Sequence, residues 1–173
     1  MLLRTAFALA VLSLLIFAQR ARSSSGSQSS TAPDKKAPAV QPLSLAEQAR
    51  FEAGKELYAV ICGACHQPHG NGQEGLAPPL ANSEWATGSE ERLIRISLQG
   101  LRGPIKVSGK TYQQEMPALA ILEDEQIAAV LTYIRREWGN AAAPVDPKTV
   151  ARIRAETAKR EDAWTEAELL KIP

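Results

Sequence analysis

The chain has 173 residues, of which 45% are hydrophobic and 23% are charged, and its formal net charge at pH 7 is +1. This balance does not suggest nucleic-acid binding, which usually relies on clustered basic residues. Residues 44–140, where we expect the folded core, hold 9 Lys and Arg against 12 Asp and Glu. The core is therefore slightly acidic, and we expect no nucleic-acid partner.

Residues 1–21 are typical of an export signal or of an uncleaved membrane anchor. Arg4 precedes an apolar run at residues 6–18, which suits a signal peptide and is short of the about 20 residues that a membrane span needs. No cysteine follows this run directly, so we expect no lipoprotein. Residues 22–43 are rich in Ser, Ala and Pro, which predicts a flexible linker. The protein is expected to be periplasmic or otherwise exported, with membrane contact only if the first segment is retained.

A capping pattern at Ser44 and Glu47 predicts the start of the first helix. The helix contains Gly54, and because a glycine inside a helix costs up to about 1 kcal/mol, we expect another helix to approach closely there. Helical spacing of apolar residues predicts an inner stripe that runs directly into the cysteine motif. The stripe consists of Leu45, Ala49, Ala53, Leu57 and Ile61.

Residues 62–66, CGACH, contain both cysteines of the chain. We compare four explanations: a redox-active dithiol, a zinc site, two buried thiols beside an incidental histidine, and covalent attachment of haem. A redox dithiol usually follows a strand in a βαβ unit, whereas the preceding residues here predict a helix. A zinc site usually takes its second pair of ligands from a separate segment, but the only other histidine is the nearby His69.

Haem attachment gives every residue of this motif a role. Cys62 and Cys65 bind the porphyrin vinyl groups, and His66 ligates the iron from the proximal side. Gly63 and Ala64 are small enough to let the backbone lie close to the macrocycle. We therefore favour haem.

Two further helices and a hairpin are predicted downstream. One helix follows Ser89, a hairpin turns around Ser108 and Gly109 within residues 105–112, and a helix spans about 124–138 before Gly139 and Asn140. The expected inner positions are Leu93, Ile94, Ser97, Leu98 and Leu101 for the first helix, and Ile127, Val130, Leu131, Ile134 and Trp138 for the second.

Met116 is the only methionine after Met1, and it is the candidate second ligand of the iron. Methionine is usually a core side chain, but Met116 lies in a predicted loop rather than on a helical stripe. His69 is the rival, and it lies too close to His66 to reach the opposite face of a haem. We expect His69 to be a solvated loop residue.

Taken together, the chain resembles a class I, mono-haem cytochrome c over most of residues 44–140. The resemblance is carried by GKELY at 54–58, CGACH at 62–66, APPL at 77–80, EMPAL at 115–119 and the segment 127–140. It implies an all-α fold of three to four helices around one covalent haem c, with Met116 before the last helix as the distal iron ligand. It also implies that the first and last helices cross, with Gly54 and Tyr58 matching one helix and Leu131 and Tyr133 the other.

The resemblance further suggests which residues surround the haem. The carbonyl of Pro78, or alternatively that of Pro79, should accept a hydrogen bond from His66 and so orient the imidazole. The haem propionates would be contacted by Trp85, Arg102 and Tyr112, each of which is equally explained as ordinary packing or surface.

Filled axial positions predict a one-electron carrier rather than an enzyme. The alternatives are a haem enzyme or gas sensor whose Met116 dissociates, and a zinc-stabilised interaction module. Residues 93–112, followed by EMPAL, resemble the cytochromes found beside quinoprotein alcohol and sugar dehydrogenases. The expected partners are therefore redox proteins, with such a dehydrogenase as donor and a terminal oxidase as acceptor.

Residues 141–173 predict a helical C-terminal extension. Asp146 and Pro147 predict the start of a helix that runs to about Arg160, and the segment TEAE at 165–168 predicts a second capped helix. We expect the extension to fold back on the core rather than to form a docking arm, because the apolar side chains at 164, 169 and 170 would otherwise be exposed.

Overall fold

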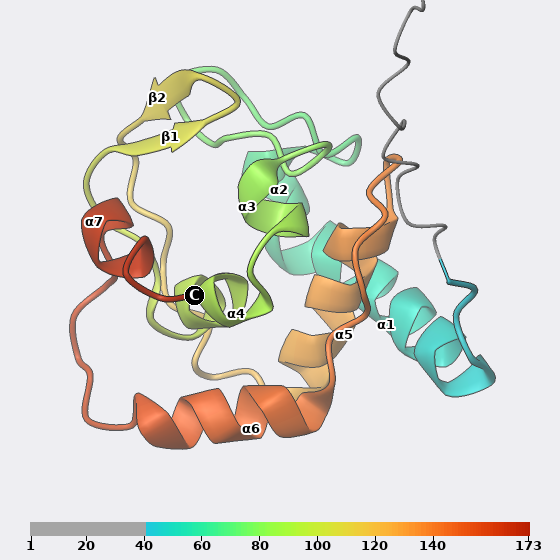
Figure 1. The fold of residues 1–173 in the computed structure, drawn as a ribbon. Helices are drawn as coiled ribbons and strands as arrows, with labels where there is room; N and C mark the ends of the chain where they lie inside the picture. Colours follow the sequence, from blue (N-terminus) through green and yellow to red (C-terminus); the bar gives the residue numbers. More distant parts are fainter. Residues whose placement is uncertain (1–40) are drawn as a thin grey trace, which may run out of the picture. The chain divides into compact units, whose positions relative to one another are not determined.

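The computed structural model describes residues 41–173. The predicted signal or anchor segment, and the linker up to residue 40, lie outside the described residues. The described part is mostly helical, with one two-stranded antiparallel sheet (Figure 1), which confirms the predicted fold class. Its elements are α1 (Leu45–Ile61), α2 (Gly63–His66), α3 (Glu84–Thr87), α4 (Glu90–Gln99), β1 (Ile105–Val107), β2 (Lys110–Tyr112), α5 (Asp124–Arg136), α6 (Pro147–Glu156) and α7 (Glu166–Leu169).

Helix α1 begins as predicted but turns a different face to the core. The backbone N–H of Ser44 donates to the Glu47 carboxylate at 2.7 Å, and the Ser44 hydroxyl accepts from the Glu47 backbone N–H at 3.3 Å. The predicted inner stripe is wrong in its first three positions, since Leu45 is 93% exposed and residues 49 and 53 are also exposed. The buried face contains Gly54 and Tyr58, because close helix contact depends on a small residue as well as on apolar character.

Helices α1 and α5 cross at Gly54. A Cβ atom added there would overlap the carbonyl of Ala129 and lie 3.0 Å from the Cβ of Tyr133, so the predicted close approach is confirmed. Leu131, in contrast, points away from this crossing and lines a cavity. Beside the crossing, four aromatic rings contact one another at centroid distances of 5.1 to 5.3 Å; they belong to Phe51, Tyr58, Tyr133 and Trp138.

The middle of the chain forms the predicted elements. Helix α4 buries four of the five predicted inner positions, Leu93, Ile94, Ser97 and Leu98. Leu101 is also buried, but it lies beyond the end of the helix at Gln99 and pairs with Met116 instead. The hairpin pairs Ile105 with Tyr112 and Val107 with Lys110, and its turn contains Ser108 and Gly109. Helix α5 ends at Arg136, two residues earlier than predicted.

The C-terminal extension packs against the core, as expected. Asp146 caps α6 by accepting from the backbone N–H of Lys148 at 2.9 Å, and α6 ends at Glu156 rather than near residue 160. Val150 and Ile153 of α6 are 0% exposed, and α6 contacts α5 and α4, below which it runs in Figure 1. Leu170 is an exception to the prediction, since it remains 57% exposed.

Buried apolar side chains form two clusters. The larger cluster joins α1, α4, α5 and α6. The smaller cluster, which we call the distal cluster, joins the end of α4, the hairpin and α7, and consists of Ile96, Leu101, Ile105, Val107 and Leu169. None of the helices in residues 41–173 combines the length and apolar character needed to cross a membrane.

Candidate functional site

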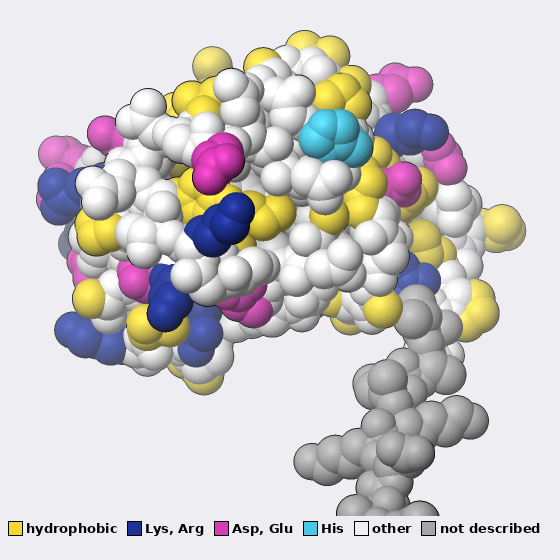
Figure 2. Space-filling model, turned by 90° about the horizontal axis from the view of Figure 1, so that it is seen from above, with side chains coloured by type: hydrophobic (Ala, Val, Ile, Leu, Met, Phe, Trp, Pro, Cys, Tyr) yellow, Lys and Arg dark blue, Asp and Glu magenta, His cyan; other side chains and the backbone are white. Residues whose placement is uncertain are grey.

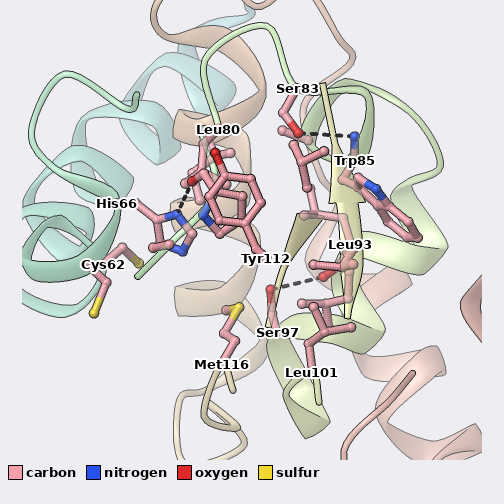
Figure 3. A pocket seen from close by; sticks show the side chains of 18 of the residues that line it. Cys62, His66, Leu80, Ser83, Trp85, Leu93, Ser97, Leu101, Tyr112 and Met116 are labelled. Atoms are coloured by element: carbon pink, nitrogen blue, oxygen red, sulfur yellow. Dashed lines mark hydrogen bonds between the residues drawn. The ribbon is translucent and has the colours of Figure 1, made fainter. Parts of the chain in front are cut away.

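A cavity of about 330 Å³ lies between the two apolar clusters. Its lining comes from α2, the loop 76–80, α4, the hairpin, the loop 114–119 and α5 (Figure 3). Most of the lining side chains are apolar, including Leu93, Ile96, Leu101, Val107, Val130 and Leu131. The cavity is therefore suited to a large apolar group that enters the core.

The cysteine motif lines one side of this cavity. Cys62 ends α1 by donating its backbone N–H to the carbonyl of Tyr58 at 2.9 Å, and the backbone N–H of His66 donates to the carbonyl of Cys62 at 2.9 Å. This continuous helical path brings both thiols and the imidazole to the cavity. Cys62 is buried and Cys65 is exposed at the rim.

His66 is oriented by a backbone carbonyl. Its Nδ1 lies 2.9 Å from the carbonyl oxygen of Pro78, so Nδ1–H donates and Nε2 keeps its lone pair for a metal. Of the two predicted prolines, Pro78 makes this contact. Burial lowers the pKa of His66, and the hydrogen bond to Pro78 partly opposes this effect; the neutral imidazole that metal binding requires is favoured.

Asn140 fixes the loop that carries Pro78. Its side-chain amide donates to the carbonyls of Leu80 at 3.0 Å and Ile134 at 2.7 Å, and its side-chain oxygen accepts from the backbone N–H of Asn82 at 2.7 Å. The sequence indicated only a helix stop at this position. No local signal reveals the contacts with Leu80 and Asn82, because these two partners lie about 60 residues earlier in the chain.

Met116 reaches the same cavity from a different loop. Its backbone pairs with Leu101, donating N–H to the Leu101 carbonyl at 2.9 Å and accepting from the Leu101 N–H at 3.0 Å. Figure 3 shows the Met116 thioether and the His66 imidazole both directed into the cavity. The structure therefore brings together the two side chains that the sequence singled out as iron ligands.

The remaining predicted residues divide into two groups. Trp85 and Tyr112 line the cavity, and the indole N–H of Trp85 donates to the carbonyl of Lys106 at 2.9 Å, which fixes the ring at the cavity wall. Arg102 is not among the lining residues; its guanidinium lies 3.9 Å from Asp162 and is half exposed, so the structure gives the propionate role no support. His69 is exposed and also lies outside the lining, as expected of a loop residue.

Two competing explanations of the motif lose support. Within residues 41–173 no three His, Cys, Asp or Glu side chains are arranged closely enough to hold a metal ion between them, which does not favour a zinc site. Burial and the neighbouring Cys65 raise the pKa of the Cys62 thiol to about 11. A reactive dithiol needs the opposite shift, because the thiolate is the nucleophile.

The donor set and the cavity fit a covalently attached haem: two thiols at the edge, an imidazole with a free Nε2, a thioether, and apolar walls. These features define a haem-binding protein of the electron-transfer type, with the mostly helical fold of a small c-type cytochrome.

Comparison with known proteins agrees with this class. Residues 51–138 match the family model described as cytochrome c. The chain is 36% identical to cytochrome c-552 of Thermus thermophilus over 128 residues, which cover 69% of this chain and 97% of that protein. The protein belongs to the cytochrome c family, resembles class I members, and carries covalently bound haem c with its iron.

Longer relatives also match. The chain is 36% identical to the gluconate 2-dehydrogenase cytochrome c subunit of Pantoea cypripedii over 107 residues, which cover 60% of this chain and 24% of that protein. It is 32% identical to the fructose dehydrogenase cytochrome subunit of Gluconobacter japonicus over 110 residues, which cover 59% of this chain and 22% of that protein. Electron transfer by a haem c protein is the function that these similarities support.

Proposed function

We propose that this protein is an exported one-electron carrier whose haem iron is held by His66 on the proximal side and Met116 on the distal side. The observation that carries the proposal is that the two side chains enter one apolar cavity from separate segments of the chain. The haem supplies the exchange of a single electron at its iron. The chain supplies the two ligands, their orientation and the apolar surroundings.

Each of these contributions follows from the geometry. Pro78 holds the His66 ring at a fixed angle, and Asn140 holds the loop of Pro78. The soft thioether of Met116 and the apolar walls favour the ferrous form, which raises the reduction potential. Because both ligand segments are anchored by backbone hydrogen bonds, little rearrangement is needed when one electron arrives or leaves.

The alternative function, a haem enzyme or gas sensor, requires Met116 to leave the iron. Met116 uses both its backbone N–H and its carbonyl in pairing with Leu101. This pairing favours a fixed ligand, and therefore a carrier.

Carbon monoxide binding to the reduced, haem-loaded protein tests the ligand assignment. We expect weak binding in the wild type at neutral pH, and strong binding together with a lower reduction potential in Met116→Ala, because only the variant leaves the distal position open. His69→Ala is the control and should match the wild type. If Met116→Ala keeps the spectrum and potential of the wild type, another side chain is the distal ligand and the proposal is wrong.

For the partner, we propose a quinoprotein-type dehydrogenase as electron donor and a terminal oxidase as acceptor. Support for the donor comes from relatives that are named as cytochrome subunits of gluconate, fructose and quinone-dependent alcohol dehydrogenases. On the face shown in Figure 2, basic and acidic side chains are mixed rather than separated into patches, which favours short-range contacts over long-range charge steering.

Stopped-flow reduction of the haem protein by a purified dehydrogenase of this type tests the proposed donor. A reduction rate no faster than that with an unrelated reductase would contradict the proposal.

A further inference from the structure

Leu101 is paired on both sides. One side pairs with Met116 in the antiparallel sense, as described above. The other side pairs with Trp164 in the parallel sense: the Arg102 N–H donates to the Trp164 carbonyl at 2.8 Å, and the Trp164 N–H donates to the Gly100 carbonyl at 3.1 Å. The C-terminal extension is thus linked to the Met116 backbone through Leu101, which pairs with both segments.

The side chain of Trp164 is itself held in place. Its indole N–H donates to the Gln99 side chain at 3.1 Å, and the Arg160 guanidinium carbon lies 3.5 Å from the ring centroid. Arg160 also pairs with Glu168 at 3.0 Å. These contacts connect Trp164, which pairs with Leu101, to the capped start of α7.

The segment that follows Trp164 completes the distal cluster. Leu169 is 0% exposed and packs in that cluster with Leu101, and Met116 packs against the same cluster. Further along, the carbonyl of Ile172 accepts from the Nε of Arg92 in α4 at 2.8 Å, and Figure 1 shows the C-terminus beside α4. The last ten residues therefore form an outer layer of the cavity wall that carries Met116.

We propose that residues 164–173, which we call the C-terminal segment, position the distal ligand Met116 by holding Leu101 from the side opposite to it. The inference rests on the proposed ligation by His66 and Met116. The segment lowers the fraction of molecules in which the thioether leaves the iron. Trp164 and Leu169 are positioning residues, since they act on Met116 through Leu101 and the distal cluster.

The extension contains a matched control for this role. Ile153 in α6 is also an aliphatic side chain at 0% exposure, but it belongs to the larger cluster. Removing either side chain leaves a cavity and destabilises the fold. Only Leu169 lies in the cluster against which Met116 packs, so the two variants separate a positioning role from a structural one.

The experiment compares Leu169→Ala and Ile153→Ala as full-length, haem-loaded proteins. Carbon monoxide binds only molecules whose methionine is off the iron, so its apparent affinity rises in proportion to their fraction. We expect a rise of about ten-fold in Leu169→Ala, equivalent to about 1.4 kcal/mol. When oxidised Leu169→Ala is heated, the absorption band of the methionine–iron bond should disappear further below the temperature of global unfolding than it does in the wild type. Ile153→Ala should lower the melting temperature while leaving both ligand readouts unchanged.

The outcomes distinguish this inference from the proposal on which it rests. If the wild type shows no methionine–iron band, the ligation is wrong and the inference falls with it. If the band is present but both variants shift the ligand readouts equally, the C-terminal segment is only structural and the inference is overturned. If Leu169→Ala does not accumulate as folded protein, Trp164→Leu replaces it. The Trp164 ring is only partly buried, so changing it opens no fully buried site. The same ten-fold rise in carbon monoxide affinity is expected.

Discussion

Gly54 of α1 and Ala129 of α5 lie in direct backbone contact, with no room for a side-chain atom between them. The contact sets the distance between α1 and α5, two of the helices that contribute to the larger cluster. It also sets the position of the cysteine motif, because α1 continues into residues 62–66.

Gly54→Ala should therefore destabilise the protein, although alanine is the better helix former. The added methyl group would overlap the Ala129 carbonyl, and overpacking of this kind typically costs about 1–3 kcal/mol. Urea unfolding of the haem-loaded protein measures the change. Equal stability of Gly54→Ala and the wild type would contradict the close helix crossing.

Arg135 should contribute strongly to stability through three backbone carbonyls. Its guanidinium donates to Ala143 at 2.7 Å and to Ala86 and Gly88 at 3.1 Å each, and it is buried. Arg135→Met leaves these carbonyls without their donor, and we expect a loss of about 2–4 kcal/mol, since each buried unsatisfied group costs about 1–3 kcal/mol.

Arg152→Met is the matched control for this substitution. Arg152 pairs with Glu91 and Glu156 on the surface, where ion pairs contribute little, so its loss should be clearly smaller. Thermal melts of both variants at one salt concentration decide the comparison. Similar losses would show that the buried position of Arg135 has no special importance.

Glu168 should make the stability of the C-terminal segment depend on acid pH. Hydrogen bonds from the side chain and backbone of Thr165, and then from Arg160, lower the pKa of Glu168 from 4.5 to about 2. Because the folded pKa lies below the unfolded one, the stabilisation is complete above pH 4.5 and is lost as the pH falls toward 2. The effect is small, since this side chain is 38% exposed and screened by solvent.

Melting temperatures measured from pH 7 down to about pH 2 check this dependence. Glu168→Gln should melt below the wild type at neutral pH, and the difference should shrink with acidification. Glu161→Gln changes an exposed neighbour and should show no such convergence. A constant difference between Glu168→Gln and the wild type would argue against the assigned pKa direction.

Ending the chain at Asn140 should do more than lower the melting temperature. The deletion removes four side chains at 0% exposure, Val145, Val150, Ile153 and Leu169. At about 1.5–3 kcal/mol each, their combined loss approaches the total stability of a small domain, about 5–15 kcal/mol. We expect calorimetry of the truncated protein to show no cooperative transition; cooperative unfolding within a few degrees of the full chain would show that the extension is dispensable.

Local signals in the sequence determined the helix starts and the chemistry of the site. Capping at Ser44, Asp146 and Thr165 occurs within three residues of each cap, so the sequence alone predicts it. The same holds for residues 62–66, whose spacing matches one edge of a haem, and for Met116, which stood out by its rarity. These features depend on neighbours along the chain or on residue type alone.

Tertiary packing decided everything that depends on distant partners. The buried face of α1 was mispredicted because Ala129 of α5, 75 residues away in sequence, determines where a glycine is needed. The contacts of Asn140 and the placement of Arg102 outside the cavity have the same origin. The sequence predicted that the extension folds back on the core. Only the structure shows that Trp164 pairs with Leu101 beside Met116, because a backbone pairing of single residues leaves no pattern in the sequence.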